Sequence, residues 1–360
     1  MSATLDRLDM LLERRLEASV SYFAAESGRL AVLCRTMAER FERGGRLLAV
    51  GGSPQAWSDA HHVAVEFVHP VIVGKRALPA LAVEPGAVEL LGRDDDMVIS
   101  FEPLTVRAGE EWALEPVAAD PFVRQELAET AYHCLWELVH VFFDHLGSSD
   151  AGAGASGFLY PFLGAGSGDL DAVVEDVRAS VLMKAAEVSE LREHTLAGGR
   201  EELTAAAAML WQALDGGGTL LAFGNGGSAT DALDVVADFR AAPQGWPERR
   251  ALSLTDPAIL TAIANDIGPA AVFSRQLIAY GRPGDVALAL STSGSSANII
   301  EALGEARRRG LGTIAFVGYD GGRIAAERLA DHVVVTPSEH IPRIQETQAS
   351  AYHVLRELVG

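Results

Sequence analysis

The chain contains two stretches that match each other segment by segment, and this repeat limits the architectures open to it. The segment "GGRLLAVGGS" (44–53) matches "GGGTLLAFGNGGS" (216–228), and "SDAHHVAVEF" (58–67) matches "TDALDVVADF" (230–239). Further on, "RQELAETAYHCLWELV" matches "RIQETQASAYHVLREL" near the end of the chain. A repeat of about 170 residues indicates a duplicated domain rather than a solenoid of short repeats.

The repeat also sets the domain boundaries that we expect. We predict a first domain at 1–147, a linker rich in Gly, Ala and Ser at 148–168, and a second domain at 169–360. Asp59 matches Asp231, 172 residues later, whereas His133 matches His353, 220 residues later, so the first copy lacks 48 residues (220 − 172). The missing part includes the counterparts of "STSGSSANIIEAL" and "GTIAFVGYDGG".

The second copy alternates short apolar runs with stretches of helical periodicity. Long helical patterns span roughly 3–43 and 169–214, and the apolar runs have the length and composition of buried parallel strands. These runs are "TLLAFG", "RALSL", "VALALS" and "GTIAFVGY". The pattern predicts an α/β fold, a parallel sheet with helices on both faces, and a shortened version of it in the first copy.

Composition and charge exclude several classes of function. The chain of 360 residues is 49% hydrophobic, which is enough for sizeable cores, and its formal net charge is −20. An acidic chain repels nucleic acid and anionic membranes, so we expect neither as a partner. The N-terminal segment lacks the features of a signal peptide and no apolar run is long enough to cross a membrane, so we expect a cytoplasmic protein. Cys34 and Cys134 lie in apolar-periodic stretches and are expected to be buried free thiols.

Two glycine- and serine-rich turns suggest a site for a phosphate. Each turn connects a predicted strand to a helix, and a helix N-terminus offers free N–H groups and a favourable dipole to an anion. Asn225 and Ser228 add donors to the first turn, and hydroxyls crowd the second, at Ser291, Thr292, Ser293, Ser295 and Ser296. The alternative interpretation is simple N-capping by a serine or threonine, which needs only one hydroxyl.

The motifs "GNGGS", "LTAIANDIG", "GDVALALSTSGSSANII", "GYDGG" and "RIQE" occur in an order that resembles the SIS (sugar isomerase) family, in particular its phosphoheptose isomerase branch. The resemblance spans about 169–360 and implies a flavodoxin-like α/β fold. It implies that Asp266 faces the sugar. It also implies contacts to a sugar phosphate from Asn225, Ser291, Thr292, Ser293 and Ser296, to which we add Ser228 and Gln345 as expected substrate contacts.

The resemblance also implies a zinc ion held by His, Glu, Gln and His, with the Glu and the second His as proton carriers. The family pattern is D-A-x-H-x-x-x-E on one helix and Q-x7-H on a later one. The second copy retains Gln345 and His353 but carries Asp234 for the first His and Asp238 for the Glu. The alternative for these two aspartates is a solvated or hydrogen-bonded helix face.

The first copy fills all four family positions but has no serine-rich loop. Its candidate metal ligands are His62, Glu66, Gln125 and His133. An i, i+4 pair such as His62 and Glu66 faces one side of a helix and can hold one Zn²⁺ or another divalent metal. We expect Glu66 and His133 to be the catalytic residues.

These complementary features lead to one hypothesis and two alternatives. The hypothesis is an isomerase of the sedoheptulose 7-phosphate type, with a site shared between the halves and two chains forming a pseudo-tetramer. In the first alternative, catalysis stays in the C-terminal half, with Asp238 as base and His353 as acid. The second alternative is a non-catalytic sugar-phosphate-binding regulatory or assembly protein of the same family.

Overall fold

The computed structural model describes residues 2–71, 75–143 and 170–360. It divides into two compact units: a C-terminal unit of Met1–Arg15 and Val188–Gly360, and an N-terminal unit of Leu16–Glu187. The predicted linker at 148–168 lies outside the described residues, so the boundaries at 147 and 169 stay predictions. The boundaries between the two compact units lie elsewhere, at residues 15–16 and 187–188, and each falls within a long helix.

These long helices agree closely with the predicted helical patterns. They are α1 (Ser2–Glu42), α6 (Leu170–Gly198) and α7 (Arg200–Asp215). A glycine separates α6 from α7: a Cβ atom at Gly199 would lie 2.7 Å from the carbonyl oxygen of Thr195. The first part of α1 belongs to the C-terminal unit, where the buried Arg15 Nη2 donates to Glu357 Oε2 at 2.7 Å.

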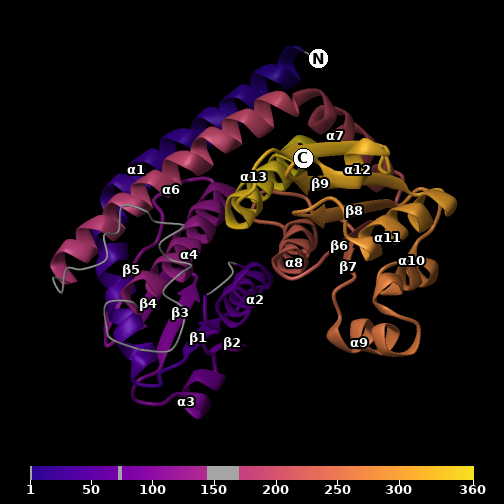
Figure 1. Ribbon diagram of the computed structural model, residues 1–360. Helices are drawn as coiled ribbons and strands as arrows, with labels where there is room; N and C mark the ends of the chain where they lie inside the picture. Colours follow the sequence, from indigo (N-terminus) through magenta and orange to yellow (C-terminus); the bar gives the residue numbers. More distant parts are fainter. Residues whose placement is uncertain (1, 72–74, 144–169) are drawn as a thin grey trace. The chain divides into compact units, whose positions relative to one another are not determined.

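The sheet of the C-terminal unit is entirely parallel and has the order β10-β9-β8-β6-β7 (Figure 1). Leu220 pairs with Ala251 on one side and with Val286 on the other. The four predicted strands are confirmed, and the edge strand β10 was not predicted. The strands are β6 (Leu220–Gly224), β7 (Ala251–Ser253), β8 (Val286–Ser291), β9 (Gly312–Gly318) and β10 (His332–Thr336).

Helices cover both faces of this sheet, as predicted. Leu220 and Ala222 point into the core shared with α7, α8 and α13, whereas Leu221 and Phe223 point into the core shared with α10, α11 and α12. This alternation follows from the two-residue period of a strand. The helices after α7 are α8 (Gly227–Arg240), α9 (Pro257–Asp266), α10 (Ser274–Tyr280), α11 (Ala297–Arg308), α12 (Gly322–Ala326) and α13 (Ile341–Val359), with a short 3₁₀ helix η1 (Pro269–Ala271).

The N-terminal unit repeats three of these strands and then departs from the pattern. Its order is β2-β1-β3-β4-β5, and the parallel part β2-β1-β3 corresponds to β7-β6-β8. The strands β4 and β5 are antiparallel to their neighbours. They stand on the side of β3 where the other unit has β9 next to β8. The elements are β1 (Leu47–Val50), α2 (Pro54–Val68), β2 (Ala80–Val83), α3 (Ala87–Leu91), β3 (Met97–Phe101), β4 (Leu104–Ala108), β5 (Glu110–Ala113) and α4 (Pro121–Phe143).

The antiparallel strands explain how the first copy can be 48 residues shorter. A parallel strand needs a crossover of a dozen or more residues, whereas antiparallel strands can be joined by a tight turn. Gly109 makes the turn between β4 and β5 with φ of +89°. The first copy is therefore shortened, as expected, and its sheet contains both parallel and antiparallel strands. Across the described ranges, no helix combines the length and apolar character that crossing a membrane requires.

Candidate functional site

The first glycine-rich turn connects β6 to α8 in the C-terminal unit. A Cβ atom at Gly224 would lie 2.3 Å from the carbonyl oxygen of Ser228, so the turn closes only around glycine. Gly226 occupies the N-cap position with φ of 56° and provides no side-chain cap. The first N–H groups of α8 therefore receive no side-chain cap from the residue that precedes them.

The second turn, at the end of β8, is a serine-rich loop held from within. Ser291 Oγ accepts from the N–H of Gly294 at 3.1 Å, and Ser295 Oγ accepts from the N–H of Arg323 at 3.2 Å. A Cβ atom at Gly294, whose φ is 59°, would lie 2.2 Å from the carbonyl oxygen of Gly321. Ser293 Oγ accepts from the N–H of Ser295 at 3.3 Å, so three of the five hydroxyls support the loop, and Ser291 is buried. Thr292, Ser293 and Ser296 remain at least partly accessible.

The helix caps bear on the alternative of simple N-capping. Ser296 is the N-cap residue of α11, yet its side chain makes no capping hydrogen bond. Side-chain caps are present at two other helices: Ser53 Oγ accepts from the N–H of Ala56 at the start of α2, and the side chain of Asp256 caps α9. The helices α3, α7, α10, α12 and α13 have no such cap. Both glycine- and serine-rich turns therefore lead into helices without a side-chain cap from the N-cap residue, the arrangement that suits an anion.

The corresponding helix of the N-terminal unit is closed to an anion. Its helix α2 starts with the capping Ser53 followed by Pro54 at the first helical position. Proline has no N–H group that could bind an anion, and the N–H of Ala56 already donates to the oxygen of Ser53. This agrees with the sequence-based expectation that the first copy lacks the phosphate-binding loops.

Side-chain amides connect the two turns of the C-terminal unit. Asn225 Nδ2 donates to Asn298 Oδ1 at 3.1 Å, and Asn298 Nδ2 donates to Asn225 Oδ1 at 2.8 Å. Asn298 lies on α11 and was not among the predicted site residues. The sequence could have indicated Asn298, because it lies two residues after Ser296, at the start of the helix.

Asp266 ends α9 and is exposed, and its Oδ1 accepts from Asn265 Nδ2 at 2.8 Å. Its expected position facing the sugar stays a prediction.

A buried cluster of His62, Glu66 and His133 occupies the N-terminal unit. His62 Nε2 lies 3.2 Å from His133 Nε2 and 3.9 Å from Glu66 Oε1. One ligand atom from each residue lies within 4.8 Å of the others, so a single metal ion could bind all three. Burial, and then the neighbouring His133, hold the pKa of His62 well below its ordinary value. The neutral imidazole is the form that binds metals.

Gln125, the fourth predicted ligand, lies on α4, eight residues before His133, and is half-buried. The sequence spacing thus places both on one helix as expected, and the participation of Gln125 stays a prediction.

The C-terminal unit has a matching cluster of Asp234, Asp238 and His353. His353 Nε2 lies 3.4 Å from Asp234 Oδ2 and 3.2 Å from Asp238 Oδ2. The hydroxyl of Tyr352 donates to Asp234 Oδ2 at 2.7 Å. All three cluster residues are buried, so the solvated form of the alternative is wrong for the two aspartates, whereas a hydrogen-bonded helix face is compatible with the bond from Tyr352 to Asp234. Gln345 is buried on the same helix α13, eight residues before His353.

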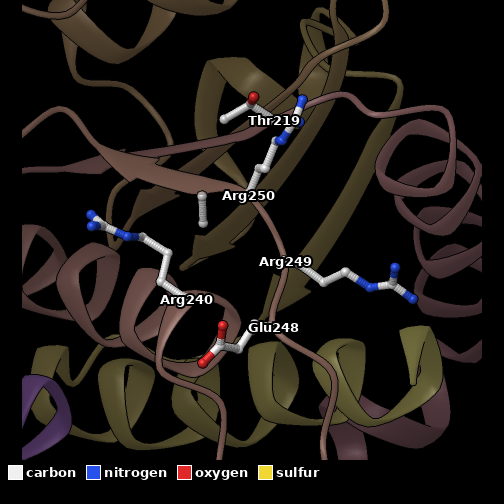
Figure 2. A pocket seen from close by; sticks show the side chains of 6 residues that line it. Thr219, Arg240, Glu248, Arg249 and Arg250 are labelled. Carbon is white, nitrogen blue, oxygen red and sulfur yellow. The ribbon is translucent and has the colours of Figure 1, made fainter.

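A cavity of about 510 Å³ lies elsewhere in this unit, around the first residues of β6 and β7. Figure 2 shows the side chains of Arg240, Arg249 and Arg250 pointing in different directions, without a common focus for an anion. Ligands of open α/β sheets bind at the carboxyl ends of the strands. We therefore place the candidate site at the two turns. The cavity is lined by Thr219, Arg240, Glu248, Arg249, Arg250 and Ala251.

Comparison with known proteins identifies relatives of the segment that contains both turns. The SIS domain family matches residues 185–318, which include both turns. The C-terminal domain of glucosamine-fructose-6-phosphate aminotransferase from Francisella tularensis has a similar fold, with a TM-score of 0.56 at 12% identity, and the likeness covers 97% of this chain and 93% of that one. Fold and turns together define an α/β protein with two SIS-type halves.

Two relatives narrow the assignment. The phosphoheptose isomerase of Thermodesulfovibrio yellowstonii is 44% identical over 155 residues, covering 42% of this chain and 76% of the relative. That of Geobacter sulfurreducens is 41% identical over 192 residues, covering 52% of this chain and 97% of the relative. The chain belongs to the phosphoheptose isomerase family, a family of enzymes.

Proposed function

We propose that the chain is a phosphosugar aldose–ketose isomerase that interconverts sedoheptulose 7-phosphate and a glycero-manno-heptose 7-phosphate. The observation that carries this proposal is the pair of helix N-termini without side-chain caps from their N-cap residues, α8 and α11, which follow the adjacent strands β6 and β8. The choice of sugar rests on the relatives, which are phosphoheptose isomerases.

The phosphate would bind to backbone N–H groups and hydroxyls. The chain carries a net charge of −20, so a phosphate site must attract its ligand locally. The N–H groups of α8 and α11 supply this attraction, and Thr292, Ser293 and Ser296 add donors. In addition, each amide of the Asn225–Asn298 pair has a second N–H that the pair does not use.

Isomerisation moves a proton between two adjacent carbons, which requires a base, and between two oxygens, which requires an acid–base partner. In our proposal Glu66 removes the proton from one carbon and returns it to the neighbouring carbon, and His133 moves the proton between the oxygens. The ligand chemistry of His62, Glu66 and His133, with Gln125, fits Zn²⁺ or another divalent ion. When bound, such an ion would stabilise the negative charge that develops on the substrate oxygen.

The sequence-based prediction that both halves contribute to one site is retained as part of this proposal. So is the prediction of a cytoplasmic homodimer that forms a pseudo-tetramer, which measurement of the molar mass by light scattering would test.

A second arrangement of the same activity is favoured by a specific observation. Asp238 and His353 lie in the same compact unit as the phosphate-binding turns. Ser228 and Asp238 lie on the same helix α8. In this arrangement Asp238 is the base and His353 the acid.

Two conservative variants separate the arrangements. Glu66→Gln and Asp238→Asn each remove a carboxylate with little change in shape, and Glu89→Gln and Asp215→Asn are exposed controls in the respective units. We expect Glu66→Gln to reduce kcat by at least about a hundredfold, because loss of a general base typically costs that much. Near-normal turnover in Glu66→Gln together with loss in Asp238→Asn would transfer the chemistry to the C-terminal cluster.

A third result would reject catalysis altogether. Exchange of substrate carbon-bound hydrogen with deuterated water, followed by NMR, detects the proton transfer directly. Tight binding of sedoheptulose 7-phosphate by the unmodified protein without exchange or turnover would favour a sugar-phosphate-binding regulatory protein.

A further inference from the structure

One face of the sheet in the N-terminal unit lacks a helix that covers its counterpart in the C-terminal unit. Leu48 matches Leu221 in the repeat, and the residues paired with them on the next strand are Val98 and Ala287. Leu221 and Ala287 lie in the core shared with α10, α11 and α12, but the first copy lacks the counterpart of α11. Leu81, which pairs with Leu48 on the other side, is 41% exposed. The shortening of the first copy therefore leaves apolar side chains on a face that α11 covers in the complete copy.

A cavity of about 330 Å³ lies on this face of the sheet. Leu48 and Val98, each the second residue of its strand, line the cavity together with Val88 of α3. Arg107 of β4 is the register partner of Val98, so its side chain extends to the same face, where it also lines the cavity. The cavity thus lies near the amino ends of β1 and β3 and combines apolar walls with a cationic side chain.

A second arginine, Arg40, reaches the cavity from near the end of α1, over Gly109. A Cβ atom at Gly109, in the turn between β4 and β5, would lie 2.9 Å from Arg40 Nη2. Arg40 Nη1 donates to the carbonyl oxygens of Asp94 and Asp96, at 3.3 Å and 3.5 Å. These carbonyl groups orient the guanidinium without neutralising its charge.

The cavity is lined by more positive than negative charge, although the chain as a whole is acidic. Arg93 and Arg107 line it, are exposed, and have no side-chain hydrogen bond or ion pair within the described ranges. Of the two carboxylates at the cavity, that of Asp96 is paired with Arg46 at 2.6 Å, which leaves that of Asp94. Together with the arginine of α1, the two exposed arginines give the cavity an excess of positive charge that favours an anionic ligand.

We propose that this cavity binds an organic phosphate with a flat, apolar body, of the size of a nucleoside monophosphate. Its volume lies within the range of about 300–1,000 Å³ for small-molecule sites, which combine apolar walls with a few polar groups. Val88 and Val98 contact the apolar body, and the guanidinium groups of Arg93 and Arg107 bind the phosphate, for which their planar arrangement of donors is suited. The cavity lies in the unit that lacks the serine-rich loop, so it is a site separate from that of the proposed isomerase substrate.

Isothermal titration calorimetry of the full-length protein with adenosine monophosphate (AMP) and with phenyl phosphate, in the absence of sugar phosphate, tests this proposal. We expect the double variant Arg93→Gln/Arg107→Gln to bind AMP at least about tenfold more weakly, because each substitution removes charge-assisted hydrogen bonds. Both side chains are exposed, so the double variant should fold. Arg29→Gln, at an exposed position of α1 that does not line the cavity, should bind AMP as the unmodified protein does.

Val98→Phe tests the apolar part of the cavity without changing a charge. The larger side chain would occupy space that the ligand needs, so AMP and phenyl phosphate should each bind at least about tenfold more weakly. Val68→Phe, at a position of the same unit that is 48% exposed, is the matched control and should leave both affinities unchanged. Absence of binding of both probes to the unmodified protein, or an unchanged affinity for AMP in the double arginine variant, would overturn the proposal.

Ala297→Pro, which removes an N–H at the start of α11, separates this cavity from the proposed phosphate site of the C-terminal unit. We expect this variant to bind AMP with unchanged affinity. If it bound AMP more weakly while the double arginine variant did not, AMP would bind at the serine-rich loop and the cavity site would be wrong. A protein that binds AMP in the cavity but does not convert sedoheptulose 7-phosphate would contradict the proposed isomerase activity alone.

Discussion

The side chains of Asn225 and Asn298 exchange amide hydrogen bonds in both directions, at 3.1 Å and 2.8 Å. The pair joins the turn after β6 to the first turn of α11, so the two elements proposed to bind the phosphate are connected to each other. Removal of Asn298 releases Asn225, whose amide must then be ordered by the ligand.

We therefore expect Asn298→Ala to raise the dissociation constant for sedoheptulose 7-phosphate by about three- to tenfold, the effect of losing one or two modest hydrogen bonds. Isothermal titration calorimetry measures this change. Gln244→Ala, at an exposed position of the same unit, should leave the affinity unchanged. An unaltered affinity in Asn298→Ala would mean that the amide pair has no part in binding.

A substitution at Ala297, the first residue of α11, tests whether the N-terminus of this helix binds phosphate. Ser296 has φ of −63° and ψ of 126°, which is the conformation preferred before proline, and Ala297 is exposed at the first helical position. Ala297→Pro should keep or slightly raise the thermal stability while removing one N–H donor. Since hydrogen bonds to charged groups contribute about 1.5–3 kcal/mol, phosphate affinity should fall by roughly ten- to a hundredfold.

Ala297→Gly retains the N–H and serves as its control, with near-normal affinity for inorganic phosphate. If Ala297→Pro bound phosphate as well as Ala297→Gly, the N-terminus of α11 would not be part of the site.

The serine-rich loop should not tolerate a side chain at Gly294. Alanine there combines a positive φ with a Cβ atom 2.2 Å from the carbonyl oxygen of Gly321, so Gly294→Ala should lower the free energy of unfolding by at least about 2 kcal/mol. Gly304→Ala, in the exposed interior of α11 with no atom within 4 Å of the added Cβ, should instead raise it by about 0.5–1 kcal/mol. Urea unfolding measures the free energy of unfolding of both variants. Equal changes in the two would contradict the close contact between Gly294 and the carbonyl oxygen of Gly321.

His140 should make the N-terminal unit sensitive to acid. Burial, with a smaller effect of Lys75, lowers the pKa of His140 to about 4 from 6.5. The unfolded chain takes up this proton below pH 6.5 while the folded chain does not, so stability is full above about pH 6.5 and falls as the pH drops towards 4. Between pH 7 and pH 5 the loss from this residue should be about 2 kcal/mol.

His140→Gln should remove that part of the pH dependence in urea unfolding. The ring nitrogens of His140 lie 2.9 Å from the carbonyl oxygen of Trp136 and 3.1 Å from that of Arg76. Two such acceptors favour the protonated ring, so an NMR titration with a midpoint above 6.5 would show that they outweigh burial.

The sequence predicted the C-terminal sheet because its strands are apolar on both sides. Leu220 to Phe223 are all buried, two towards each layer of helices, and such a run is visible without tertiary information. The hairpin of β4 and β5 was not predicted, because the exposed Arg107, Glu110 and Glu111 interrupt the apolar pattern. On a strand with one solvated face such charges are ordinary.

The candidate site, too, could be predicted from the sequence only in part. Glycines and serines at the turns are a local signal, so the two turns between strand and helix could be predicted. That Asp238 and His353 act together was one of the sequence-based alternatives, and it came from the resemblance and not from a local pattern, because α8 and α13 meet through packing of residues about 120 positions apart. The burial of Asp234, Asp238 and His353 could be known only from the structure.

Finally, the buried pair of Arg15 and Glu357 has a consequence for how the protein is made. The first helix supplies a cation to the last, so the C-terminal unit is closed by residues from both ends of the chain. Arg15 is synthesised before Glu357, so this ion pair can form only after α13 has been synthesised. Expression of 169–360 alone would remove Arg15 together with Leu8 and Leu11, which belong to the same core, and would expose part of that core to water. The C-terminal unit is therefore not equivalent to the C-terminal half of the gene.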